Sequence, residues 1–329
     1  MRNLTLTHRS AIVSSIALIL LSVPIAAAQT PLRKPRKFPI VISKPGSYQL
    51  IENLEVKTGD AILVTSPNVN IDLDGFAISG LPGGSSGIGI DAAGMAFVRV
   101  SNGSITNMGG VGIALGANGS VNSVRVSGSG ANGIECGNNC SIADSNDSSN
   151  ALYGILAGAN SSIRDCLANG NANGFGIAVG TGSSVTGSTA SGNSTGGISA
   201  GNHSVPCNCR ITGNVANNNV IGIFVGDSAV VSGNMTGGNQ SFGICGGKSS
   251  TIAGNTSNGN LGQGIISFAG GLVMGNTITG NQGIGIDFMD DGGTATYGQN
   301  VMLNNQGGDV SGGKSLSPGN TNLCSGTAC

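Results

Sequence analysis

The sequence of 329 residues contains no tryptophan, three tyrosines and eight phenylalanines, and only 9% of its residues are charged. This leaves little aromatic surface for stacking on sugar rings and few ionisable groups for acid–base catalysis. Lysine and arginine do not cluster over the body of the chain, which excludes an electropositive nucleic-acid face. Composition therefore weighs against an enzyme and predicts no nucleic-acid partner.

Helical patterns and long apolar runs are also absent beyond residue 28. No later window keeps the i, i+3, i+4, i+7 stripe of a helix, and no membrane span is expected after signal removal. Residues 1–28 have the form of a secretory signal peptide, with Arg2 and Arg9 before an apolar stretch and small residues at its end. We expect a secreted or periplasmic protein.

Residues 29–39 form a basic, proline-containing segment that we interpret as a linker. It carries four of the basic residues, and the body from Phe38 onward has 8 basic against 15 acidic side chains, a net charge of −7. A solvated tether is the simpler interpretation of such a charge run, although an acidic surface could bind it. The four residues are Arg33, Lys34, Arg36 and Lys37.

What the chain has in abundance is glycine, with 59 residues, and a recurring Gly-Ile dipeptide. Successive repeats begin 21–25 residues apart, and a unit this short cannot form a domain alone. The period therefore predicts a solenoid of stacked units. The repeat glycines are Gly87, Gly112, Gly133, Gly154, Gly176, Gly197, Gly222, Gly243, Gly264 and Gly285.

Within each repeat, short apolar runs bounded by Gly, Asn and Ser predict strands separated by tight turns. Two or three such strands in about 21 residues make one coil of a parallel β-helix, with coils about 4.8 Å apart. An asparagine recurs at one position and can form a side-chain ladder along the stack. These residues are Asn150, Asn171, Asn193, Asn239, Asn260 and Asn281, with Asn218 or Asn219 in the longer repeat.

The predicted fold is an all-β, single-stranded parallel β-helix of about 10–11 coils over residues 40–329. An exposed solenoid end favours aggregation and needs a cap. We assign the N-terminal cap to residues 40–80, the repeats to 81–308 and a short C-terminal tail to 309–329.

Two stretches, residues 42–50 and 68–76, resemble the opening of exported bacterial right-handed parallel β-helix repeat proteins. The later repeats are similar to those of the same pectate-lyase-like superfamily. The resemblance implies a right-handed helix related to polysaccharide enzymes. The acidic calcium ligands and proton-removing Arg or Lys of those lyases have no matching local motif here, and fold alone does not assign an activity.

The most enzyme-like group of residues is Asp144 with Asp165, which occupy the same position in adjacent repeats. Stacked carboxylates repel unless a proton or cation lies between them, and Ca²⁺ is the usual oxygen-bound cation. Arg164 could then hold an acidic sugar, with Arg125 and Asp147 at the same edge. The alternative is a solvated turn in which Asp acts as a turn former. Periodicity alone does not say which way these side chains point.

Two further clusters are candidate cation or metal sites. Asp287, Asp290 and Asp291 could bind a cation, or form an irregular terminal loop. His203, Cys207 and Cys209 lie in the long repeat and could bind a soft metal such as copper. In an oxidising compartment such cysteines more often pair with each other.

The eight cysteines suit an exported protein with disulfides. The sequence does not fix the connectivity, and the candidate local pairs are Cys136 with Cys140 and Cys324 with Cys329. Cys166 and Cys245 have no evident mates in the sequence, which is typical of buried packing residues.

The sequence favours a non-catalytic surface or matrix protein that presents a face for a polysaccharide or a cell-surface component. A polysaccharide lyase or epimerase acting on an acidic glycan is the alternative, and periplasmic copper handling is a lesser one. Binding without product formation distinguishes the first hypothesis from the second.

Overall fold

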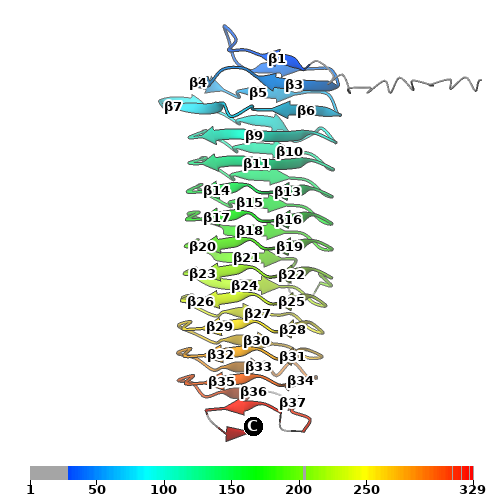
Figure 1. Cartoon of the computed structure of the whole chain (residues 1–329), viewed down its shortest axis with the longest axis vertical. Coiled ribbons are helices and arrows are strands. Elements are labelled where there is room, and N and C mark those ends of the chain that lie inside the picture. The colour runs from blue at the N-terminus through cyan, green and yellow to red at the C-terminus, as the bar shows by residue number, and fades with distance from the viewer. Residues whose placement is uncertain (1–28, 203–204, 313, 320, 326, 329) are drawn as a thin grey trace, which may run out of the picture.

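The structure, a computed structural model, describes all residues except 1–28, 203–204, 313, 320, 326 and 329. The predicted signal peptide, His203 and Cys329 therefore lie outside the described residues. The chain winds into a parallel β-helix of about 14 turns stacked along its long axis (Figure 1). Throughout the described part, no helix has the length and apolar character needed to cross a membrane.

One side of the stack is a 13-stranded parallel sheet, here called sheet B, to which nearly every coil contributes one short strand. Its strands, in spatial order, are β2 (Ile40–Ile42), β5 (Ile62–Val64), β8 (Ile90–Ala92), β10 (Ile113–Leu115), β12 (Ile134–Cys136), β15 (Ile155–Ala157), β18 (Phe175–Val179), β21 (Gly196–Ala200), β24 (Ile221–Val225), β27 (Ile244–Cys245), β30 (Ile265–Ser267), β33 (Ile286–Phe288) and β36 (Val310–Gly312).

The remaining strands form sheet A, which has 26 strands arranged as two ladders joined by β9 and β11. The first ladder is β1 (Thr30–Leu32), β3 (Gly46–Leu50), β6 (Val69–Asp72), β9 (Arg99–Thr106), β11 (Ser120–Ser127), β13 (Ser141–Ala143), β16 (Ser162–Arg164), β19 (Ser184–Thr186), β22 (Arg210–Thr212), β25 (Val230–Ser232), β28 (Thr251–Ala253), β31 (Leu272–Met274), β34 (Thr294–Gly298) and β37 (Lys314–Leu316).

The second ladder of sheet A also includes the later halves of β9 and β11. Its other strands are β4 (Leu54–Gly59), β7 (Ala77–Ser86), β14 (Asn146–Ser148), β17 (Leu167–Asn169), β20 (Thr189–Ser191), β23 (Val215–Asn217), β26 (Met235–Gly237), β29 (Thr256–Asn258), β32 (Thr277–Thr279), β35 (Val301–Leu303), β38 (Leu323–Cys324) and the antiparallel β39 (Thr327–Ala328).

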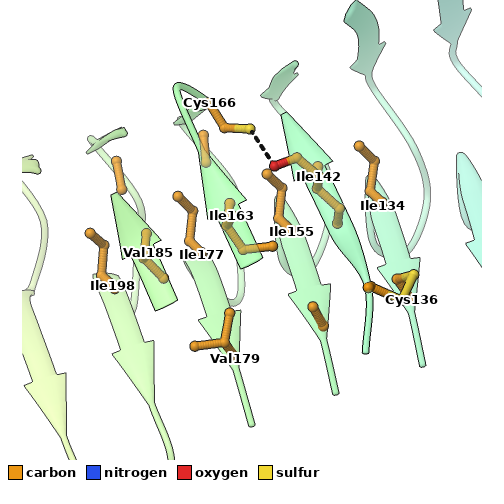
Figure 2. Close-up of a cluster of buried hydrophobic side chains, with 14 of the residues drawn as sticks. Ile134, Cys136, Ile142, Ile155, Ile163, Cys166, Ile177, Val179, Val185 and Ile198 are labelled. Carbon is orange, nitrogen blue, oxygen red and sulfur yellow. Dashed lines mark hydrogen bonds between the residues drawn. A yellow bond between two sulfur atoms is a disulfide. The ribbon is translucent and has the colours of Figure 1, made fainter. Parts of the chain in front are cut away.

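The core is a set of aliphatic columns inside the coil, produced by the alternation of side chains along each short strand. In most coils, sheet B and the first ladder of sheet A each place at least one β-branched residue inward, and these side chains meet in the centre (Figure 2). In the middle coils they are Ile134, Ile155, Ile177 and Ile198 from sheet B, and Ile142, Ile163 and Val185 from sheet A, all fully buried.

The structure has more coils than the 10–11 predicted, because that number counts only coils that carry the Gly-Ile dipeptide. Residues 40–80 also supply strands that pair in parallel with those of the next coils, such as β2 with β5 and β3 with β6. Part of the predicted linker belongs to the sheet as well. Thr30–Leu32 pairs with β3, and Leu32 is buried.

Buried asparagines form two hydrogen-bonded ladders along the stack, each side-chain amide donating to the Oδ1 of the next coil. The first ladder has Nδ2–Oδ1 distances of 2.8–3.4 Å and uses Asn219, while Asn218 lies in a turn with φ 56°. It comprises Asn150, Asn171, Asn193, Asn219, Asn239, Asn260, Asn281 and Asn305. The second, at 2.9–3.0 Å, comprises Asn214, Asn234, Asn255, Asn276, Asn300 and Asn322.

The glycine of the Gly-Ile repeat is required by the close stacking of coils. A Cβ on Gly222 would overlap the carbonyl oxygen of Gly243 in the next coil. We expect Gly222→Ala to lower the free energy of unfolding by about 3 kcal/mol, because the backbone must shift to relieve the overlap. Gly254→Ala meets no atom within 4 Å, so it should cost only about 1–2 kcal/mol for its left-handed backbone. Chemical denaturation of both variants measures the two losses of unfolding free energy. Equal losses for Gly222→Ala and Gly254→Ala would contradict a role for Gly222 in coil stacking.

Candidate functional site

The outer face of sheet B carries a groove of about 450 Å³ that spans β15, β18, β21 and β24. Three aromatic side chains line it, from the few that the chain contains: Tyr153, Phe175 and Phe224. Aliphatic and small polar side chains complete the lining, namely Leu156, Ala178, Thr195, Ser199, Asn202 and Ile221.

The groove exists because the strand alternation places one residue per coil outward between two inward ones. Leu156, Ala178, Ser199 and Phe224 are register partners in successive strands, and their neighbours on either side are buried. Gly196 pairs with Phe175, and a Cβ there would overlap the phenylalanine ring. The missing side chain at position 196 lets that ring lie along the sheet and form one wall of the groove.

The charged residues in the outward column of sheet B are all acidic. The outward column from Val41 to Ser311 contains Asp91, Glu135 and Asp287 but no Lys or Arg. Glu135 accepts a hydrogen bond from Asn132 (2.9 Å), and Asp287 accepts one from Gln263 (3.3 Å). The groove therefore suits an uncharged ligand with an apolar face better than an acidic one.

Sequence reasoning missed this groove because it counted aromatic residues over the whole chain. Tyr153 and Phe175 each directly precede the glycine of their repeat, so aligning the repeats would have placed them in one column. Phe224 occupies a different repeat position, and its proximity depends on the register of β24 with β21.

Asp144 and Asp165 lie on the opposite part of the coil, in the two-residue turns that connect the two ladders of sheet A. Both have left-handed backbones, with φ of 52° and 53°, and both are exposed. The positive charge between them is Arg164, whose Nη1 lies 3.8 Å from Asp144 Oδ2 and 3.7 Å from Asp165 Oδ2. With all three side chains about half exposed, these contacts contribute little stability.

Asp147, predicted at the same binding edge, instead points into the core and is fully buried. The two-residue turn after Ala143 resets the alternation, so that Asp147 takes the inward position between Val126 and Ala168. It is therefore unavailable to a ligand, and that prediction is wrong. Arg125 lies on the outer face of the second ladder and is exposed.

The acidic residues near the last coils are not gathered around one point. Asp287 faces outward on sheet B, and Asp290 is exposed. Asp291 accepts a hydrogen bond from the backbone of Ala269 (3.1 Å) and pairs with Lys248 (3.3 Å). Across the described residues, no three His, Cys, Asp or Glu side chains are gathered as metal ligands would be.

The structure contains disulfides between Cys136 and Cys140 and between Cys207 and Cys209. The second bond joins the two sulfurs that were candidate copper ligands, while His203 lies outside the described residues. Cys324 is also disulfide-bonded.

Cys166 and Cys245 are buried, and burial raises the pKa of both thiols to about 12. The Cys166 thiol donates to the carbonyl oxygen of Ile142 (3.8 Å, Figure 2).

Comparison with solved structures places this architecture among known folds. The A-module of the Azotobacter vinelandii mannuronan C-5 epimerase AlgE6 superposes with a TM-score of 0.65 at 17% identity, over 85% of this chain and 90% of that one. The periplasmic alginate epimerase AlgG gives 0.51 at 13% identity, over 85% and 74%. The chain is a right-handed parallel β-helix.

Another right-handed parallel β-helix, the catalytic domain of a GH87 α-1,3-glucanase, superposes with a TM-score of 0.51 at 14% identity, over 86% of this chain and 62% of that one. Residues 182–315, less than half of the chain, match a family model described as periplasmic copper-binding protein (NosD). No curated protein matches the sequence. At these identities the solved structures establish the fold alone.

Proposed function

We propose that this β-helix is an exported, non-catalytic protein that binds a neutral glycan in the aromatic groove of sheet B. The observation that carries the proposal is the clustering of Tyr153, Phe175 and Phe224 in one concave site, in a chain otherwise poor in aromatic residues. Concave sites lined by aromatic and apolar side chains with a few polar groups are typical of small-ligand binding.

Polar groups suited to sugar hydroxyls border the aromatic surface. Thr195, Ser199 and Asn202 line the same groove and offer hydroxyl and amide groups that both donate and accept hydrogen bonds. The acidic side chains on the same sheet face disfavour uronate polymers by like-charge repulsion. An extended neutral glycan that lies across several coils satisfies both features.

The comparisons support a carbohydrate ligand in general terms. Solved structures with this fold include two epimerases named for mannuronan and alginate and a glucanase, and the family model and AlgG carry periplasmic names. We propose the same exported location for this chain, in agreement with its predicted signal peptide.

The test is titration calorimetry of neutral oligosaccharides with the mature protein. We expect Phe224→Ala and Phe175→Ala each to weaken binding about tenfold or more, because each removes a large apolar contact with the sugar ring. Phe97→Ala removes another exposed phenylalanine and should leave affinity unchanged. Equal affinity of all variants for the oligosaccharide would show that the glycan does not bind in the groove.

The same mixtures distinguish binding from catalysis. Released unsaturated or epimerised sugars would favour the lyase or epimerase alternative, whose candidates Asp144, Asp165 and Arg164 lie on sheet A. We do not extend the proposal to copper handling, although the matched family is named for it. Cys207 and Cys209 are joined as a disulfide, whereas the thiolate is the form that binds soft metals.

A further inference from the structure

All four arginines of the body after Phe38 lie on the outer face of sheet A. They are Arg99, Arg125, Arg164 and Arg210, and all are exposed. The body carries a net charge of −7, so this is a local concentration of positive charge on an otherwise acidic molecule. None of them lies on sheet B, which holds the aromatic groove.

Two of these arginines terminate a column of serine hydroxyls on the first ladder. The register pairs successive strands so that the column runs Arg99, Ser120, Ser141, Ser162, Ser184, Arg210. Five steps of about 4.8 Å place the two guanidinium-bearing residues about 24 Å apart along the axis. Each intervening coil offers one outward hydroxyl.

A parallel outward column lies two residues further along the same strands. It runs Ser101, Asn122, Ala143, Arg164, Thr186, Thr212, so that a third arginine sits between the first two along the axis. We call the two columns together the arginine–serine face. A shallow groove of about 360 Å³ on this face contains both Arg99 and Arg164.

The arginine–serine face contains no carboxylate in either column. Three acidic groups border the face: Asp72, which precedes Ser101 in the second column, and Asp144 and Asp165 on the adjoining turn. Asp144 accepts a hydrogen bond from Asn122 (3.1 Å). Arg164 lies 3.8 Å from Asp144 and 3.7 Å from Asp165 in half-exposed geometry. Contacts of this kind are weak and screened by salt. Within the described part of the chain, the guanidinium groups of Arg99 and Arg210 form no ion pair, and they present donors that fit carboxylate or sulfate.

We propose that the arginine–serine face binds an extended acidic glycan lying parallel to the helix axis, with its anionic groups on the arginines and its hydroxyls on the serine and threonine columns. The alternation of three widely spaced cations with neutral hydroxyl groups matches a polyhydroxylated chain with anionic substituents. The face carries no aromatic side chain on which a nucleobase could stack, which disfavours single-stranded nucleic acid. This site is independent of the neutral-glycan groove of the proposed function.

The test uses the mature full-length protein and four probes: an oligogalacturonate, a sulfated oligosaccharide, an uncharged maltooligosaccharide and inorganic polyphosphate. We expect binding of the oligogalacturonate, the sulfated probe or both, weakened by high salt. The stronger of these two identifies carboxylate or sulfate as the natural anion. Polyphosphate binding of equal strength would show a nonspecific anion surface and overturn the proposal.

The decisive variant combines Arg99→Gln, Arg164→Gln and Arg210→Gln and should weaken acidic-glycan binding about tenfold or more. Its matched control combines Lys37→Gln, Lys44→Gln and Lys57→Gln, three exposed cations outside the face, and should change affinity less than about twofold. Equal losses in both variants would overturn the proposal. Phe224→Ala should leave acidic-glycan binding intact, which separates this site from the sheet B groove.

Discussion

Replacing one ladder asparagine, Asn239→Ala, is expected to lower the free energy of unfolding by about 3 kcal/mol. The Oδ1 atom of Asn239 accepts from the backbone N–H of Asn219 (2.9 Å), and its Nδ2 donates to the carbonyl of Ala216 (3.0 Å) and to Asn260 (2.9 Å). Alanine leaves these buried groups without partners, and each orphaned group costs about 1–3 kcal/mol.

The matched control for the ladder is Asn258→Ala, which alters an exposed asparagine of β29 in a neighbouring coil. Denaturant titration of both variants measures the difference, and the control should stay within about 0.5 kcal/mol of the parent. A loss of less than about 1 kcal/mol for Asn239→Ala would contradict a structural role for the ladder.

Replacing Asp147 by alanine is expected to stabilise the protein at neutral and alkaline pH. The carboxyl group is fully buried, and neither oxygen has a hydrogen-bond partner among the described residues. Burial raises the pKa of Asp147 well above its ordinary value of 3.8, since the charged form is poorly solvated in the core. Alanine fits the position, because the next residues of the same inward column are Ala168 and Ala190.

The pH dependence follows from the direction of that shift. Below the ordinary pKa near 4, Asp147 is protonated in both the folded and the unfolded state and does not lower the free energy of unfolding by ionising. As pH rises from there to the raised folded pKa, the unfolded state loses this proton first, so the free energy of unfolding of the parent falls. In that pH window the free energy of unfolding of the parent falls by about 1.4 kcal/mol per pH unit. The gain from Asp147→Ala should therefore grow as pH rises and then level off.

Thermal and denaturant unfolding from pH 4 to pH 9 measures the effect of Asp147→Ala. Asp290→Ala, which alters an exposed carboxylate of the last coils, is the control and should shift stability by less than about 0.5 kcal/mol at each pH. A gain that is constant across the range would show that Asp147 does not titrate in the core.

Much of the fold could be predicted from the sequence because the 21-residue period becomes spatial adjacency when coils stack. Positions that share a place in the repeat, such as Asn239 and Asn260, become hydrogen-bonded neighbours. Coils without the Gly-Ile dipeptide could not be counted this way. The coils formed by β2 to β7 were therefore not included in the predicted number of coils. Their strands have less regular spacing and carry other residues at the same positions.

The candidate site was harder to predict because orientation depends on turns. The left-handed backbone of Asp144 interrupts the strand alternation, so Asp144 points outward while Asp147, three residues later, points inward. The aromatic groove depends on Gly196 leaving space beside Phe175, and on the register that brings Phe224 from a later coil. Neither condition is visible in composition.

The measurement that tests the central claim most directly is a crystal structure of the mature protein with a neutral oligosaccharide at saturating concentration. The account predicts a sugar ring packed against Phe175 and Phe224 on the outer face of sheet B, with its hydroxyls near Ser199 and Asn202. An empty groove, or an oligosaccharide bound only elsewhere on the stack, would contradict it.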